Sequence, residues 1–97
     1  MKKYLPLGSI VTLKESEKKL MIIGRSQTCN DVFYDYSACL FPEGYLGKDQ
    51  LYVFNNDDVE NLYYVGMQNE EEFIFRRALI EAEEQENQEN PANSLQH

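Results

Sequence analysis

The period of the hydrophobic pattern changes at Glu70, and this change most constrains how the chain can fold. Before Glu70, apolar residues form short runs and alternating stretches that Gly, Pro and polar residues interrupt. Such stretches are typical of β-strands with small connections. After Glu70, the apolar residues on one arc of a helical wheel are Ile74, Phe75, Ala78, Leu79 and Ala82. This stripe predicts an amphipathic helix that docks on the sheet.

Five segments have strand character. They are residues 9–13, 20–24, 31–40, 51–54 and 62–65. Between the second and third segments, residues 26–30 are polar and predict a loop. Residues 55–60 predict one helical turn, with Asp57 as its N-cap and Glu60 reaching back to it.

The order of these segments predicts an α+β protein. We expect a small antiparallel curled sheet or SH3-like barrel of about five strands, followed by one C-terminal helix and a disordered acidic tail. A chain of 97 residues has room for one core. We therefore expect a single compact, mainly-β domain over residues 1–86, and a tail over residues 87–97 because Pro91 and many Glu, Gln and Asn residues oppose further structure.

The third segment, residues 31–40, alternates along its length. Tyr36, Ala38 and Leu40 fall on the expected core face, together with Val32 and Tyr34. Asp35 falls on the opposite face, which alternation directs to solvent. Asp35 is the acid of most interest for catalysis, but a solvent-facing strand residue explains it more simply.

Catalysis is disfavoured by the absence of suitable bases. The only histidine is His97, the last residue, so a histidine cannot readily activate a nucleophile within the fold. No acid, base and nucleophile can be assembled from the pattern. The sequence therefore predicts a protein that is not an enzyme and that has no catalytic residues and no cofactor.

Metal ligation is disfavoured as well. The oxygen-bearing cluster Asn55, Asp57, Asp58 and Glu60 lacks the Gly and Glu positions of an EF-hand loop. Two cysteines without a nearby histidine cannot complete a zinc site. We expect no metal, and we expect Cys29 and Cys39 to be free thiols.

Charge and hydropathy limit the classes of partner. The formal net charge of −8 disfavours nucleic acid. Residues 1–25 nevertheless carry six Lys or Arg against two Glu, so the alternative function is a small nucleic-acid-binding barrel that uses this basic N-terminal hairpin. No apolar run approaches the length of a membrane span. The sequence therefore predicts a cytoplasmic protein without a membrane partner.

The aromatic residues favour a protein partner. The chain has seven Tyr and five Phe, more than one small core is expected to hide. Tyr is enriched at the energetic centres of protein interfaces. The candidate interaction surface consists of Tyr45, Tyr52, Tyr63, Tyr64, Phe73 and Ile80. The main functional prediction is a non-catalytic protein-interaction module.

A series of short motifs runs along the chain. They are YLPLGSIVTLK at residues 4–14, KKLMIIGR at 18–25, YDY at 34–36, PEGYLG at 42–47, FN at 54–55 and VG at 65–66. In this order they resemble domain-of-unknown-function family 4176, over roughly residues 4–75. Residues 37–41 depart from the resemblance, because they are less regular than the apolar strand expected there.

The resemblance also implies a biological setting. The family is similar in setting to small accessory proteins encoded beside type VII secretion systems and their polymorphic toxins in Gram-positive bacteria. This implies an adaptor, chaperone-like or immunity-type role, with a secreted toxin or a secretion component as the partner. The resemblance assigns no catalytic residues.

Overall fold

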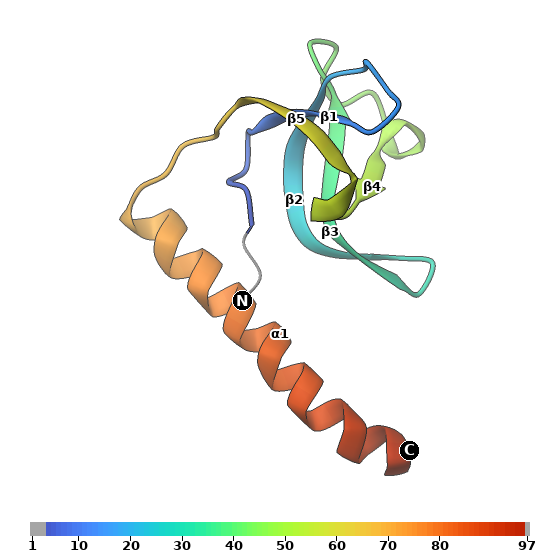
Figure 1. Cartoon of the computed structure of the whole chain (residues 1–97), viewed down its shortest axis with the longest axis vertical. Coiled ribbons are helices and arrows are strands. Elements are labelled where there is room, and N and C mark those ends of the chain that lie inside the picture. The colour runs from blue at the N-terminus through green and yellow to red at the C-terminus, as the bar shows by residue number, and fades with distance from the viewer. Residues whose placement is uncertain (1–3, 97) are drawn as a thin grey trace. The chain divides into compact units, whose positions relative to one another are not determined.

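The computed structural model describes the backbone of residues 4–96 and the side chains of residues 4–85. It divides into a sheet unit, residues 4–67, and a helix unit that begins at Gln68. The sheet unit contains β1 (Ile10–Leu13), β2 (Leu20–Cys29), β3 (Val32–Leu40), η1 (Lys48–Gln50), β4 (Tyr52–Phe54), η2 (Asn56–Asp58) and β5 (Val59–Tyr64). The helix unit contains α1 (Glu70–Gln96). Figure 1 shows these elements.

The five strands form one antiparallel sheet in the order β4-β3-β2-β1-β5. The first four strands follow one another as a meander, and β5 then returns to pair with β1. The sheet curls strongly (Figure 1), but β4 and β5 remain its two edges. The predicted fold class is therefore confirmed, and of its two forms the curled open sheet is observed.

Strand β2 is longer than predicted. It continues to Cys29, so the loop expected over residues 26–30 is wrong. Cys29 pairs with Val32 of β3, and only Asn30 and Asp31 form the turn, with φ of 52° and 67°. Asn and Asp tolerate this left-handed conformation, which a two-residue hairpin turn requires. Gln27, Thr28 and Cys29 are kept in the strand by pairing with β3.

The core lies on the inner face of the curled sheet. Its buried apolar residues are Tyr4, Val11, Leu20, Ile22, Tyr36, Ala38, Leu40 and Phe54, whereas Ile10 and Cys39 are buried on the other face. The prediction that Tyr36, Ala38 and Leu40 face the core is confirmed. By contrast, Val32 is exposed, because it lies beside the hairpin turn at the end of the sheet.

Most of the opposite face of β3 is also buried, contrary to the prediction, although Phe33 near the hairpin turn is exposed. Asp35 and Ser37 are each 7% exposed, and Cys39 is 2% exposed. Their burial is tolerated because the polar atoms have partners: for example, Ser37 Oγ lies 3.1 Å from Gln27 Oε1 as a hydrogen-bond donor. The alternating pattern of β3 could not reveal that hydrogen-bond partners from other segments cover the face that carries Asp35 and Ser37.

Tyr36 joins four parts of the sheet unit. Its side chain is fully buried. The hydroxyl accepts a hydrogen bond from the Leu5 N–H at 2.8 Å and donates to Asn56 Oδ1 in η2. The ring packs edge-on against Tyr4, with centroids 5.8 Å apart, and at a tilt against Phe54, at 5.4 Å. One side chain thus connects the N-terminal segment, β3, β4 and η2.

The turn η2 has a different cap from the predicted one. Asn55, rather than Asp57, is its N-cap. The Asn55 N–H donates to Asp58 Oδ2 at 2.9 Å, so Asp58 makes the contact expected from Glu60. The turn lies within the predicted residues 55–60 but is shorter than predicted, because β5 already begins at Val59.

The end of β5 is fastened to the segment before β1. Ser9 Oγ donates to the Pro6 carbonyl at 2.8 Å and accepts from the Gly66 N–H at 2.9 Å. A Cβ atom at Gly66 would lie only 2.0 Å from the Leu7 carbonyl oxygen. The two backbones can approach this closely only because Gly66 has no side chain.

The helix unit begins where the sequence predicts. Asn69 Oδ1 accepts from the Glu72 N–H at 2.9 Å, which caps α1. Docking of the Ile74–Leu79 side of the helix on the sheet stays a prediction. The disordered tail over residues 87–97 and the single domain over residues 1–86 also stay predictions.

Replacing Tyr36 with Phe tests the role of its hydroxyl. Tyr36→Phe leaves the Leu5 N–H and Asn56 Oδ1 without their shared partner in a buried site. We expect the free energy of unfolding to fall by about 1–3 kcal/mol, measured by urea denaturation followed by circular dichroism. The control is Tyr34→Phe, a half-buried neighbour in β3, which should change stability by less than about 0.5 kcal/mol. Equal losses in both variants would contradict this role.

Candidate interaction surface

The structure exposes five of the six side chains predicted to form an interaction surface. Tyr45 and Tyr64 are each 61% exposed, and Tyr52, Tyr63 and Phe73 are also exposed. Ile80, in the helix unit, is 9% exposed. Tyr4 and Tyr36 fill the core, so the expectation that tyrosines divide between core and surface is confirmed.

Two of these six side chains, Tyr63 and Tyr64, meet in one hollow of the sheet unit. The hollow has a volume of about 420 Å³ and is called the Tyr63/Tyr64 groove below. Its lining residues are Gly8, Ile10, Lys19, Met21, Phe41, Tyr63 and Tyr64. Tyr45 and Tyr52 are not among them.

Strand pairing places the groove on the sheet face opposite the core. Ile10 pairs with Met21 of β2 and with Tyr64 of β5, so these three residues form a row across neighbouring strands. The next residue, Val11, is fully buried in the core. Since neighbouring residues of a strand point to opposite faces, the row that begins at Ile10 faces away from the core.

A β-bulge brings Tyr63 to the same hollow as Tyr64. Ile10 pairs with Tyr64, but the next residue, Val11, pairs with Leu62, so Tyr63 is an extra residue in β5. At a bulge, two residues of one strand oppose a single residue of its partner. Simple alternation would have placed the two tyrosines on opposite faces, and sequence reasoning therefore could not bring them together.

Lys19 and Phe41 form the loop side of the groove. The Phe41 N–H donates to the Lys19 carbonyl at 3.0 Å, which holds the two loops together. The Lys19 ammonium lies 5.1 Å from the centre of the Tyr63 ring, within the range of a cation–π contact. The prediction assigned Lys19 to a basic hairpin and did not connect it with the tyrosines.

A salt bridge links the same two loops next to the groove. Lys18 Nζ lies 2.8 Å from Glu43 Oε2. The hydrogen bond from Lys18 holds the pKa of the Glu43 carboxyl below its ordinary value, with the backbone of Glu43 contributing in the same direction. At neutral pH, Glu43 is therefore a carboxylate whose charge is matched by Lys18.

Further apolar side chains surround the two tyrosines along the chain. Leu62 and Val65 are exposed, and Met67 is 74% exposed. A continuous exposed apolar stretch at a sheet edge is uncommon in proteins that function alone. The end of β5 and the residues after it thus carry further exposed apolar side chains, although these do not line the groove itself.

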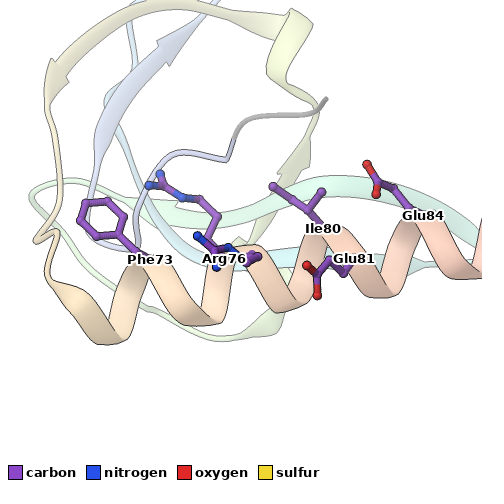
Figure 2. Close-up of a pocket in the computed structure, with 6 residues that line it drawn as sticks. Phe73, Arg76, Ile80, Glu81 and Glu84 are labelled. Carbon is purple, nitrogen blue, oxygen red and sulfur yellow. The ribbon is translucent and has the colours of Figure 1, made fainter.

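Phe73 and Ile80 belong to the helix unit. Figure 2 shows Phe73, Arg76, Ile80 and Glu84 projecting from one side of α1, where they line a pocket of about 500 Å³. The Arg76 guanidinium lies 5.1 Å from the centre of the Phe73 ring and its Nε lies 3.8 Å from Glu72 Oε2. This side of the helix is therefore partly covered by charge, unlike the Tyr63/Tyr64 groove.

Asp35 has a structural position. The expectation that it faces solvent is wrong, because the structure buries it. Its Oδ2 accepts from the Asn56 N–H at 2.9 Å, and its own N–H donates to Asn55 Oδ1 at 2.8 Å. These bonds join β3 to the start of η2. Asp35 does not line either pocket described above, and the prediction that the chain is not an enzyme stays a prediction.

The remaining chemistry-bearing residues are dispersed. Within residues 4–85, no group of three or more His, Cys, Asp or Glu side chains is placed to hold a metal ion. Cys29 is exposed and Cys39 is buried, and both are free thiols as predicted. In the part of the chain that the structure describes, no helix has the length and apolar character needed to cross a membrane.

Comparison with known families identifies the class of this chain. Residues 4–75 match the family described as Domain of unknown function (DUF4176). The match covers the sheet unit and the first turns of α1, so the chain belongs to this family. Neither the curated proteins nor the solved structures give a significant match.

The Lys18–Glu43 salt bridge predicts a measurable titration. Replacing Lys18 with Met removes the main hydrogen-bond donor, so the pKa of the Glu43 carboxyl should rise towards its ordinary value. Because the pKa is lowered in the folded protein, the small stabilisation is present above the unfolded-state pKa and is lost as pH falls through the folded-state pKa. A side-chain NMR titration measures the change. Lys48→Met, at an exposed lysine in η1, is the control and should leave the Glu43 titration unchanged.

Proposed function

We propose that this chain is a non-catalytic protein-interaction module whose docking surface is the Tyr63/Tyr64 groove. The observation that carries the proposal is the joint exposure of Tyr63 and Tyr64 beside an apolar floor on the sheet. Ile10, which forms part of this floor, is 7% exposed and is held by pairing on both sides. The floor of the groove is therefore supported by strand pairing on both sides of β1.

Burial of this surface by a partner would be favourable. Covering an exposed aromatic side chain contributes about 1.5–3 kcal/mol from the hydrophobic effect alone. Tyr loses few rotatable bonds when it is immobilised, which is one reason why it is favoured at interfaces. The pairing of β5 with β1 and the Ser9–Gly66 hydrogen bond fix the backbone beforehand, so little ordering is needed on binding.

The basic residues of the hairpin favour a protein partner over nucleic acid. Arg25 is only 8% exposed, and Lys18 is paired with Glu43. Fewer cations are thus available to phosphates than the sequence suggests, and the net charge of −8 opposes a polyanion at long range.

The family resemblance supplies a setting for this proposal. It implies an adaptor or chaperone-like accessory protein of type VII secretion, with a secreted toxin or a secretion component as the partner. The chemistry of the groove does not depend on this setting. A partner unrelated to secretion would remove the setting and leave the interaction module intact.

Two equally exposed tyrosines provide a matched test. Tyr64 and Tyr45 are each 61% exposed, but only Tyr64 lines the groove. The tagged full chain should recover a stoichiometric partner from native lysate. With the purified partner, Tyr64→Ser should weaken binding at least about tenfold in calorimetry, as expected for an interface hot spot. Tyr45→Ser should bind as the wild type does.

Folding is checked by urea denaturation of both variants, which should unfold at the wild-type midpoint because the two side chains are exposed. The proposal is wrong if no stoichiometric partner is recovered. It is also wrong if the partner binds the Tyr64→Ser variant as tightly as the wild type.

A further inference from the structure

The Tyr63/Tyr64 groove combines a largely aromatic lining with one positive charge. From this combination we infer the chemistry of its ligand: a peptide segment that presents an aromatic side chain next to a carboxylate. This inference rests on the proposed function, since it names the class of segment that the interaction module recognises. The apolar lining, the cation and the geometry of β5 each contribute to it.

The apolar lining favours an aromatic anchor. The rings of Phe41, Tyr63 and Tyr64 lie around the hollow, and Met21 contributes a thioether. Aromatic rings attract one another in edge-to-face and offset arrangements, and a thioether sulfur is attracted to a ring edge. An aliphatic side chain would gain only the hydrophobic part of these contacts. A volume of about 420 Å³ suits the insertion of one large side chain with its neighbours.

The cation supplies the second half of the ligand. Among residues 4–85, Lys19 is the only charged residue that lines the groove. Within residues 4–85, its ammonium forms no ion pair; it lies over the Tyr63 ring. The nearby Glu43 carboxylate is already occupied by Lys18. A carboxylate that enters beside the aromatic anchor therefore meets an available positive charge. The carboxylate can come from an Asp or Glu side chain or from a C-terminus.

The geometry of β5 favours side-chain insertion over the addition of a strand. β5 is an edge strand, but its register shifts twice, at Tyr63 and near Glu60. Bulges disrupt the hydrogen-bond ladder and twist an edge away from new strands. The same bulge that opposes strand addition points two tyrosine rings into the groove. A ligand is thus recognised mainly through its side chains and its charge.

Two synthetic peptides test the ligand on the full ¹⁵N-labelled chain. The first has Asp followed by Phe between Gly-Ser flanks, with both ends blocked. The second has Phe as its last residue, with a free C-terminus and no acidic side chain. At least one should shift the amide signals of Met21, Tyr63 and Tyr64 in NMR spectra. Replacing Asp with Asn in the first, or amidating the second, should weaken binding roughly fivefold or more. Replacing Phe with Leu should also weaken it.

A charge reversal in the groove completes the test. Lys19→Glu should weaken binding of the responsive peptide roughly tenfold, because attraction becomes repulsion. Lys48→Glu makes the same change in net charge away from the groove and should have no such effect. The inference is overturned if neither peptide shifts the groove signals, or if both lysine variants behave alike.

Two further outcomes separate other occupants from the proposed one. Phenylacetate binding as tightly as the peptides would indicate a small-molecule site and overturn the peptide assignment. A dimer in analytical ultracentrifugation that Tyr64→Ser dissociates would show that a second copy occupies the groove, and would also overturn it. Another result is that the captured partner loses affinity for the Tyr64→Ser variant while the peptides bind the Lys19→Glu variant as tightly as the wild type. This result would refute only the proposed ligand chemistry and would leave the proposed function intact. Without any captured partner, the proposed function itself fails.

Discussion

The buried hydroxyl of Tyr36 is the constraint on which the arrangement of the sheet unit depends. In the described sheet, β4 and β5 do not pair, so strand hydrogen bonds cannot close the curl. Side-chain hydrogen bonds connect the segments next to β4 and β5 instead. A phenol buried among apolar rings must find partners, and Tyr36 finds them in the Leu5 N–H and Asn56 Oδ1. These bonds fix the N-terminal segment and η2 relative to β3, and η2 leads directly into β5.

The position of β5 in turn determines the groove. Because η2 ends at Asp58, β5 enters beside β1, and the Ser9–Gly66 contact holds its far end. A strand fixed at both ends with an extra residue must accommodate it as a bulge. The bulge falls at Tyr63. The exposed tyrosine pair is therefore a consequence of how the sheet is held together, and it is supported by the same buried contacts that stabilise the core.

Local sequence patterns predicted the fold class well. They failed where residues far along the chain determine burial or strand register. The alternation over β3 predicted its core face because burial on that face follows from the sheet itself. The burial of Asp35 depends on Asn55 and Asn56, about twenty residues further along the chain. The bulge at Tyr63 depends on its register with β1, more than fifty residues earlier. Neither the burial of Asp35 nor the bulge can be recognised in the neighbouring sequence. The Asn30-Asp31 turn can be recognised there, since both residue types favour left-handed conformations.

A protein with a net charge of −8 can bind an acidic ligand because electrostatic forces act only over a short range in salt solution. At physiological ionic strength, charges are screened beyond about 8 Å. An approaching carboxylate therefore responds mainly to the charges close to the groove. There, Lys18 matches the charge of Glu43, and Lys19 remains available over the Tyr63 ring. The remaining acidic surface repels polyanions at low salt, and a single carboxylate beside an aromatic ring carries too little charge to be excluded. The local arrangement of Lys18, Lys19 and Glu43 thus selects a short acidic-aromatic segment, although the composition alone suggests that acids are repelled.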